Sequence, residues 1–182
     1  MILNERDVRG EHMLNVARQM MTAARTAPKG KGIDVIEVAT IAGKDIEVLS
    51  EHMRRMFEVN GMKFFLRDAD NILSADAIIL IGTREQSQGL NCGYCGFKEC
   101  GARQASVPCA LNTVDLGIAI GSACATAADL RVDSRVMFSA GQAALQLGWL
   151  EGCYCVMAIP ISASSKNPFF DRKPKETIEN PQ

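Results

Sequence analysis

Three cysteines lie within nine residues of this chain, at a spacing suited to binding a metal. Cys92, Cys95 and Cys100 form a C-x2-C-x4-C run, and Cys109 follows after eight further residues. Thiolates are soft ligands that select zinc, Cu(I) or iron–sulfur clusters, and four of them satisfy one tetrahedral ion or one four-iron cluster. We therefore expect a metal centre held by these four cysteines. Cys124, on a downstream helix, is the alternative fourth ligand.

The glycines between the thiols favour an iron–sulfur cluster over zinc. Zinc ribbons pair two short C-x2-C knuckles, whereas this chain has one such knuckle and then unequal spacings. Gly93, Gly96 and Gly101 let backbone N–H groups approach the sulfurs of an anionic cluster. A structural zinc site stays open as an alternative, as do four buried thiols without metal. Cys153 and Cys155 are two residues apart, so we expect them to share one face of a strand as small buried side chains.

Composition and charge limit where this chemistry takes place. The seven cysteines are an odd number, which argues against a disulfide framework in a monomer. The N-terminus is charged and lacks the apolar run of a secretory signal, and no later apolar run is long enough to span a bilayer, so we expect a cytoplasmic protein without a membrane segment. The net charge of −1 gives no basic field for binding nucleic acid.

Helices and strands alternate along the chain on both sides of the cysteines. Apolar residues at helical spacing, together with stretches rich in small residues, predict helices over residues 6–26, 44–60, 112–130 and 138–149. Short β-branched or apolar runs predict strands over residues 33–41, 75–82 and 153–161. This order predicts an α+β sandwich of helices around a small sheet. We expect a single domain over 1–182, with a cysteine-rich insertion at 83–110 and an extended C-terminal tail at 163–182.

The cysteine segment resembles the four-iron ferredoxin-like domain of corrinoid and redox proteins. The core of that domain reads N-C-G-x-C-G-x-x-x-C, and residues 91–100 here read N-C-G-Y-C-G-F-K-E-C. The fourth ligand of that domain lies farther downstream than Cys109 does here. Nearly the whole chain also resembles a family of uncharacterised ferredoxin-domain-containing proteins, through the segments 24–28, 115–123, 132–137 and 166–172 and the cysteine loop. The resemblance implies one 4Fe–4S cluster and brings no assigned reaction.

More distantly, the layout is similar to the nitroreductase fold, a homodimer that holds FMN at the subunit interface. In that fold a helix ends in an Ala-Pro-Ser turn that leads into a strand, and Ala27, Pro28 and Lys29 stand in the same place here. Basic residues near the C-terminus of that family approach the FMN phosphate. Its N-terminal Arg-Arg-Ser type phosphate motif is missing from residues 1–12. A bound FMN phosphate would need cations and backbone donors around it. Together with this resemblance, that need implies the following candidate FMN contacts: Arg25, Pro28, Lys29, Gly30, Arg172 and Lys173. Solvated surface charges are the alternative reading of the basic residues among them.

Three functions stay open at this point. The first is an iron–sulfur redox protein that passes electrons to a flavin or a partner protein on a nitroreductase-like homodimer, which would make a flavin-dependent oxidoreductase one candidate activity. The second is a non-enzymatic electron carrier or iron–sulfur sensor without flavin. The third is a structural zinc protein whose loop orders a binding surface.

Overall fold

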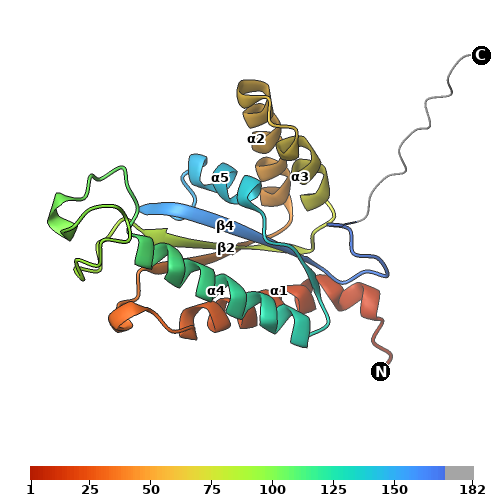
Figure 1. The fold of residues 1–182 in the computed structure, drawn as a ribbon. Coiled ribbons are helices and arrows are strands. Elements are labelled where there is room, and N and C mark those ends of the chain that lie inside the picture. The colour runs from red at the N-terminus through yellow and green to blue at the C-terminus, as the bar shows by residue number, and fades with distance from the viewer. Residues whose placement is uncertain (171–182) are drawn as a thin grey trace, which may run out of the picture.

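The computed structural model describes residues 1–170, in which a four-stranded sheet lies between two layers of helices (Figure 1). Every strand pair is antiparallel, and the spatial order is β1-β2-β4-β3. The strand bounds are β1 Ile36–Ile41, β2 Ala77–Arg84, β3 Asp133–Ser134 and β4 Cys153–Ser162. The predicted α+β sandwich is therefore the observed architecture.

The central strand β2 explains why its sequence is a continuous apolar run. Ile79 and Ile81 join the core on one face of the sheet, while Ile78 and Leu80 join the core on the other. Because both faces are covered by helices, both sets of alternating side chains are buried.

Helices α1 (Glu5–Thr26) and α4 (Ala110–Asp129) cover one face of the sheet. The Asn4 side chain caps α1 by accepting a hydrogen bond from the Arg6 N–H at 3.1 Å. The two helices are joined directly, since the Ser122 hydroxyl donates to the Ala23 carbonyl at 2.9 Å. The side of α4 that packs into this core consists largely of the alanines Ala119, Ala123 and Ala127.

Helices α2 (Lys44–Asn60), α3 (Phe64–Ile72) and α5 (Phe138–Gln146) form the second layer. α5 lies so close to β4 that a Cβ at Gly141 would stand 2.1 Å from the Val156 carbonyl oxygen. The buried Ser139 hydroxyl donates to the Asp68 carboxylate at 2.6 Å, which joins α5 to α3.

Some element bounds differ from the sequence-based expectation. α3 was not predicted, because it is only nine residues long and follows Gly61 without a capping side chain. The first strand begins at Ile36 rather than 33, since residues 30–32 form the 3-10 turn η1 (Gly30–Gly32). α5 ends at Gln146, and Gly148 just beyond it has a φ of +75°, which does not continue a helix.

Cys153 and Cys155 do not share a face of β4, contrary to the expectation from their spacing. The register with β2 shifts between Thr83 and Arg84, which pair with Cys155 and Cys153 respectively. This bulge inserts an extra residue on β4 and reverses the alternation. Cys155 accordingly packs against the α1/α4 core and Cys153 against the opposite one.

Helix α4 is long and apolar enough, by length and composition alone, to cross a membrane, contrary to the expectation that no apolar run of the chain is long enough. One third of this stretch is buried inside the protein, against α1 and the sheet. The core helix of a folded domain passes the same test, so this is weak evidence for a membrane segment.

The cysteine-containing segment, residues 85–109, connects β2 to α4 and projects from one end of the sheet (Figure 1). We call it the cysteine loop. Its one regular element is the 3-10 turn η2 (Cys100–Ala102). The C-terminal end of α1 lies at this same end of the molecule, and the N-terminus lies at the opposite end (Figure 1).

Candidate metal centre on the cysteine loop

The four candidate ligands differ in exposure. Cys92 is exposed, Cys95 and Cys100 are half-buried, and Cys109 is buried at the N-cap position of α4. Within residues 1–170, no three Cys, His, Asp or Glu side chains stand close enough together to hold a metal ion. The fold therefore brings the four thiols to one loop without gathering them into a finished ligand set, and their role as ligands stays a prediction.

The Cys100 sulfur lies among hydrogen-bond donors. The Asn91 N–H donates to Cys100 Sγ at 3.3 Å, and the Cys100 N–H donates back to Asn91 Oδ1 at 2.8 Å. The Ser87 hydroxyl, followed by the backbone N–H groups of residues 91, 90 and 89, lowers the pKa of Cys100. This part of the loop stabilises a negatively charged sulfur.

Such an environment fits the chemistry of an iron–sulfur cluster, whose cysteine sulfurs carry negative charge and accept backbone hydrogen bonds. The loop turns tightly around Cys95, where the Gly96 N–H donates to the Gly93 carbonyl at 2.9 Å. Gly93 and Gly96 have φ values of +75° and +89°, which residues other than glycine rarely adopt. These two glycines bend the backbone beside Cys95, whereas the backbone N–H groups that approach the Cys100 sulfur come from residues 89–91.

Cys124 is the weaker candidate for a fourth ligand. It lies on α4 fifteen residues after Cys109, which separates the two by roughly 22 Å along the helix axis. Burial raises the pKa of the Cys124 thiol. Burial also raises the pKa of Cys155, and together with the nearby Glu37 carboxylate it raises the pKa of Cys153 to about 11. These three thiols are therefore poor nucleophiles and poor ligands at neutral pH.

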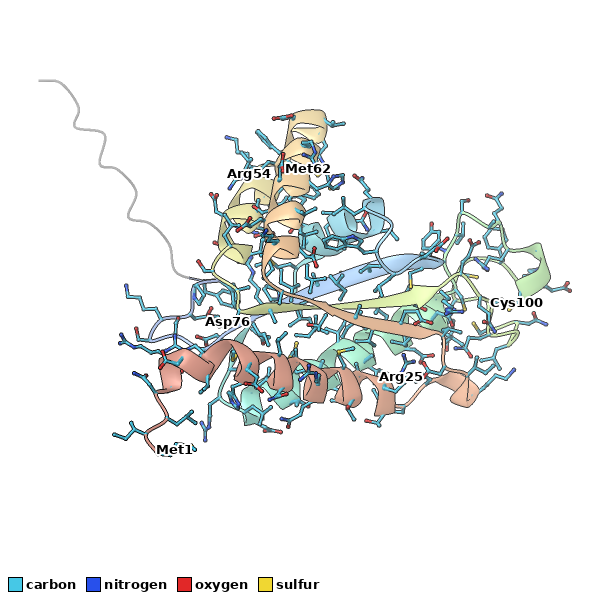
Figure 2. All side chains as sticks on the ribbon, turned by 180° about the vertical axis from the view of Figure 1, so that it is seen from behind. Met1, Arg25, Arg54, Met62, Asp76 and Cys100 are labelled. Carbon is cyan, nitrogen blue, oxygen red and sulfur yellow. The ribbon has the colours of Figure 1, made fainter. Side chains whose placement is uncertain are left out.

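The candidate flavin contacts at the end of α1 hold the turn that leads into β1. Arg25 donates to the Asp34 carboxylate at 2.7 Å and to the Ile36 carbonyl at 2.6 Å. Lys29 Nζ donates to the carbonyls of Ala24, at 3.0 Å, and of Arg25. Figure 2 places Arg25 at the same end of the molecule as Cys100. Pro28, which lies between these two cations in the sequence, is exposed, and the Gly30 N–H donates to the Asp115 carboxylate.

Arg172 and Lys173, the other two candidate flavin contacts, lie outside the described residues. Their predicted role stays an expectation.

A basic pocket that the sequence did not predict lies at the other end of the molecule. It has a volume of about 600 Å³ and is lined by Arg6, Arg9, Arg131, Asp133 and residues 162–165. Arg9 pairs with Glu5 at 2.6 Å, whereas within residues 1–170 no ion pair involves Arg6 or Arg131. Because these arginines are more than 120 positions apart in the sequence, no local pattern could have revealed the pocket.

Known proteins similar in sequence establish the family. Residues 105–172 match the family model described as "Uncharacterized protein containing a ferredoxin domain (DUF2148)". This match begins after Cys100, so it includes Cys109 but not the three clustered cysteines. An uncharacterized protein of Archaeoglobus fulgidus is 40% identical over 186 aligned positions, covering 97% of this chain and all of that relative. The chain belongs to this family of uncharacterized proteins that contain a ferredoxin domain.

Solved structures of similar fold include nitroreductases with bound FMN. A nitroreductase with bound FMN from Bacteroides fragilis has a TM-score of 0.59 at 12% identity, covering 92% of this chain and 86% of that one. A nitroreductase with bound FMN from Desulfitobacterium hafniense has a TM-score of 0.57 at 15% identity, covering 92% and 87%. A BluB-like flavoprotein from Clostridium difficile has a TM-score of 0.53 at 18% identity, covering 84% of each chain. The fold is thus nitroreductase-like.

Proposed function

We propose that this protein is a cytoplasmic iron–sulfur redox protein that carries one 4Fe–4S cluster on the cysteine loop. Cys92, Cys95, Cys100 and Cys109 would hold the cluster, which when bound supplies one-electron transfer. The single observation that carries this proposal is the Cys100 sulfur held among backbone N–H donors inside a C-x2-C-x4-C run. Seven free thiols fit a reducing compartment.

The exposure of the loop supports a role in electron exchange. Cys92 is exposed, and the neighbouring Tyr94 side chain is 75% exposed, so a partner could approach this edge directly. A structural site buried in the core would not need such access. We infer that electrons enter or leave at this end of the molecule, through a partner protein or a flavin.

FMN is the candidate flavin, because the neighbours of similar fold bind it. Two places on the chain supply cations for its phosphate. The first is the α1–β1 turn with Arg25, Pro28, Lys29 and Gly30, whose Arg25 and Lys29 side chains already bond to the protein itself. The second is the basic pocket, where within residues 1–170 Arg6 and Arg131 take part in no ion pair. The basic pocket offers the less occupied cations, whereas only the α1–β1 turn lies at the same end of the molecule as the cysteine loop (Figure 2), where a flavin could exchange electrons with the cluster.

A homodimer is the assembly we propose. The outer face of α4 exposes the apolar side chains of Val114, 53% exposed, and Ile118, 39% exposed, one helical turn apart. Exposed glycines lie beside them at Gly117 and Gly121, and a second helix could therefore approach closely. A second copy of this chain would bury this face.

Serine substitutions test which thiols hold the cluster. In protein purified without oxygen, Cys92→Ser, Cys95→Ser, Cys100→Ser and Cys109→Ser should each lose most of the bound iron and sulfide, whereas Cys124→Ser should retain wild-type levels. Retention of the cluster by the first three variants would contradict the proposal. Loss in Cys124→Ser with retention in Cys109→Ser would reassign the fourth ligand.

Titration with FMN separates the two redox alternatives. Saturable quenching of flavin fluorescence by wild-type protein, weakened by Arg6→Ala or Arg131→Ala, would support a flavin-dependent protein. A cluster-loaded protein that does not bind FMN would instead be an electron carrier or sensor.

A further inference from the structure

A buried polar cluster lies where the cysteine loop meets the body of the protein. Gln88, Asn112 and Asp115 are 3%, 2% and 4% exposed, although all three are polar or charged. Burying such groups costs free energy unless they are hydrogen-bonded. The burial of these three side chains therefore requires hydrogen-bond partners.

These three side chains bond mainly to one another and to two loops. Gln88 Nε2 donates to Asn112 Oδ1 at 2.9 Å and to Asp115 Oδ2 at 3.0 Å. Asn112 Nδ2 donates to the Gln86 carbonyl, so both Gln86 and Gln88 are fixed. The Asp115 carboxylate also accepts the Gly30 N–H, at 3.0 Å to each oxygen. The first two turns of α4 thereby hold the entrance of the cysteine loop.

The same turns of α4 hold the exit of the loop. Cys109 is the N-cap residue of α4, and its carbonyl accepts the Thr113 N–H at 3.2 Å. Asn112 and Asp115 follow it by three and six residues, so the last thiol and the clamp residues belong to one rigid element. Lys31 Nζ adds a bond to the Gln88 carbonyl at 3.1 Å from the η1 side.

We propose that Asn112 and Asp115, with Gln88, form a clamp that holds both ends of the cysteine loop so that its thiols can converge on one cluster. The inference rests on the proposed iron–sulfur function. Asn112 and Asp115 touch no thiol in this role. They are positioning residues that restrict how far Cys92, Cys95 and Cys100 can move away from Cys109, and so lower the conformational entropy lost when the ligands gather.

The packing around Gly30 is consistent with a tight clamp. A Cβ at Gly30 would lie 3.3 Å from the Gln88 Oε1 and Nε2 atoms. Within residues 1–170, Gln88 Oε1 is buried without a hydrogen-bond partner, so a side chain at position 30 would press on the carboxamide directly. Gly30→Ala should therefore weaken the clamp without removing any of its bonding groups.

The rate at which a chelator removes iron from the anaerobically loaded protein tests the clamp. The rate is measured at a temperature well below the melting temperature of every variant. Asp115→Ala and Asn112→Ala should each release iron about tenfold faster than wild type. Asp115→Asn, which keeps an oxygen to accept the Gly30 N–H, should recover part of the difference. Asp129→Ala is the matched control, because Asp129 is exposed on the same helix, and it should match wild type.

The outcomes separate the clamp from the function on which it rests. Circular dichroism of each metal-free variant shows whether it folds, and Gly30→Ala replaces any alanine variant that does not. Folded clamp variants that release iron at the wild-type rate, or a control that releases it as fast as they do, would overturn the clamp alone. Wild-type protein that binds no iron and sulfide would overturn both the clamp and the iron–sulfur function.

Discussion

The seven thiols of this chain share a chemistry but not an environment. The Cys100 sulfur accepts hydrogen bonds at the edge of an exposed loop, whereas Cys153 lies beside the Glu37 carboxylate against the core. Donors around Cys100 favour the thiolate, while burial and a neighbouring negative charge disfavour it at Cys153. The cysteine loop is thus where the protein makes a charged sulfur favourable.

Alkylation of the metal-free protein should follow this difference. With a pKa of about 11, only roughly one Cys153 thiol in a thousand is ionised at pH 8, and it is also half-buried. Iodoacetamide followed by mass spectrometry should find the exposed Cys92 modified well before Cys153. Labelling of Cys153 should accelerate as the pH rises toward 11. Equal rates for the two residues at pH 8 would show that Cys153 is more accessible or more acidic than described.

At the scale of elements, the contact between α5 and β4 depends on one glycine. A Cβ at Gly141 would stand 2.1 Å from the Val156 carbonyl oxygen and 2.7 Å from Met157 Cα, and both are backbone atoms that cannot rotate away. Gly141→Ala should therefore lower the free energy of unfolding by about 3 kcal/mol, measured by urea denaturation of the metal-free protein.

Gly10→Ala is the control for that substitution. Gly10 lies within α1 with no atom within 4 Å of the added Cβ, so alanine there should raise stability by roughly 0.5–1 kcal/mol. If Gly141→Ala unfolds at the same urea concentration as wild type, the two elements are less tightly packed than the structure indicates.

The helices and strands predicted from the sequence are those whose local pattern of apolar residues is sufficient to identify them. The helical spacing of Met13, Val16 and Met20 predicted α1, and the apolar run over residues 75–82 predicted the buried strand that the structure has as β2. α3 was missed because it is only nine residues long and no side chain caps its N-terminus. The bulge that separates Cys153 from Cys155 depends on pairing with β2, which is not encoded locally.

In the candidate site, too, local features were predicted from the sequence and features that depend on long-range contacts were not. The glycine-spaced cysteines stand out in the sequence because their spacing is local. The clamp and the basic pocket join residues that lie far apart in the chain, such as Gly30 with Asp115, or Arg6 with Arg131, and only the fold brings them together. No alternation or motif marks Gln88 as a buried residue in a polar loop.

At the scale of the whole molecule, the exposed face of α4 predicts self-association. Replacing Val114 and Ile118 together by Glu places two charges on the face that a second copy would bury, and should convert a dimer into a monomer. Light scattering coupled to size-exclusion chromatography measures the mass directly. The same substitutions on the exposed residues Val59 and Leu73 are the control and should leave the dimer intact. A wild-type protein that elutes as a monomer would contradict the proposed assembly.

The decisive measurement for the metal centre is the iron and acid-labile sulfide content of wild-type protein purified without oxygen. We expect about four iron and four sulfide ions per chain, with a brown colour that fades on exposure to air. One zinc ion per chain without sulfide would instead indicate a structural site. Colourless protein without metal would contradict any metal centre on the cysteine loop.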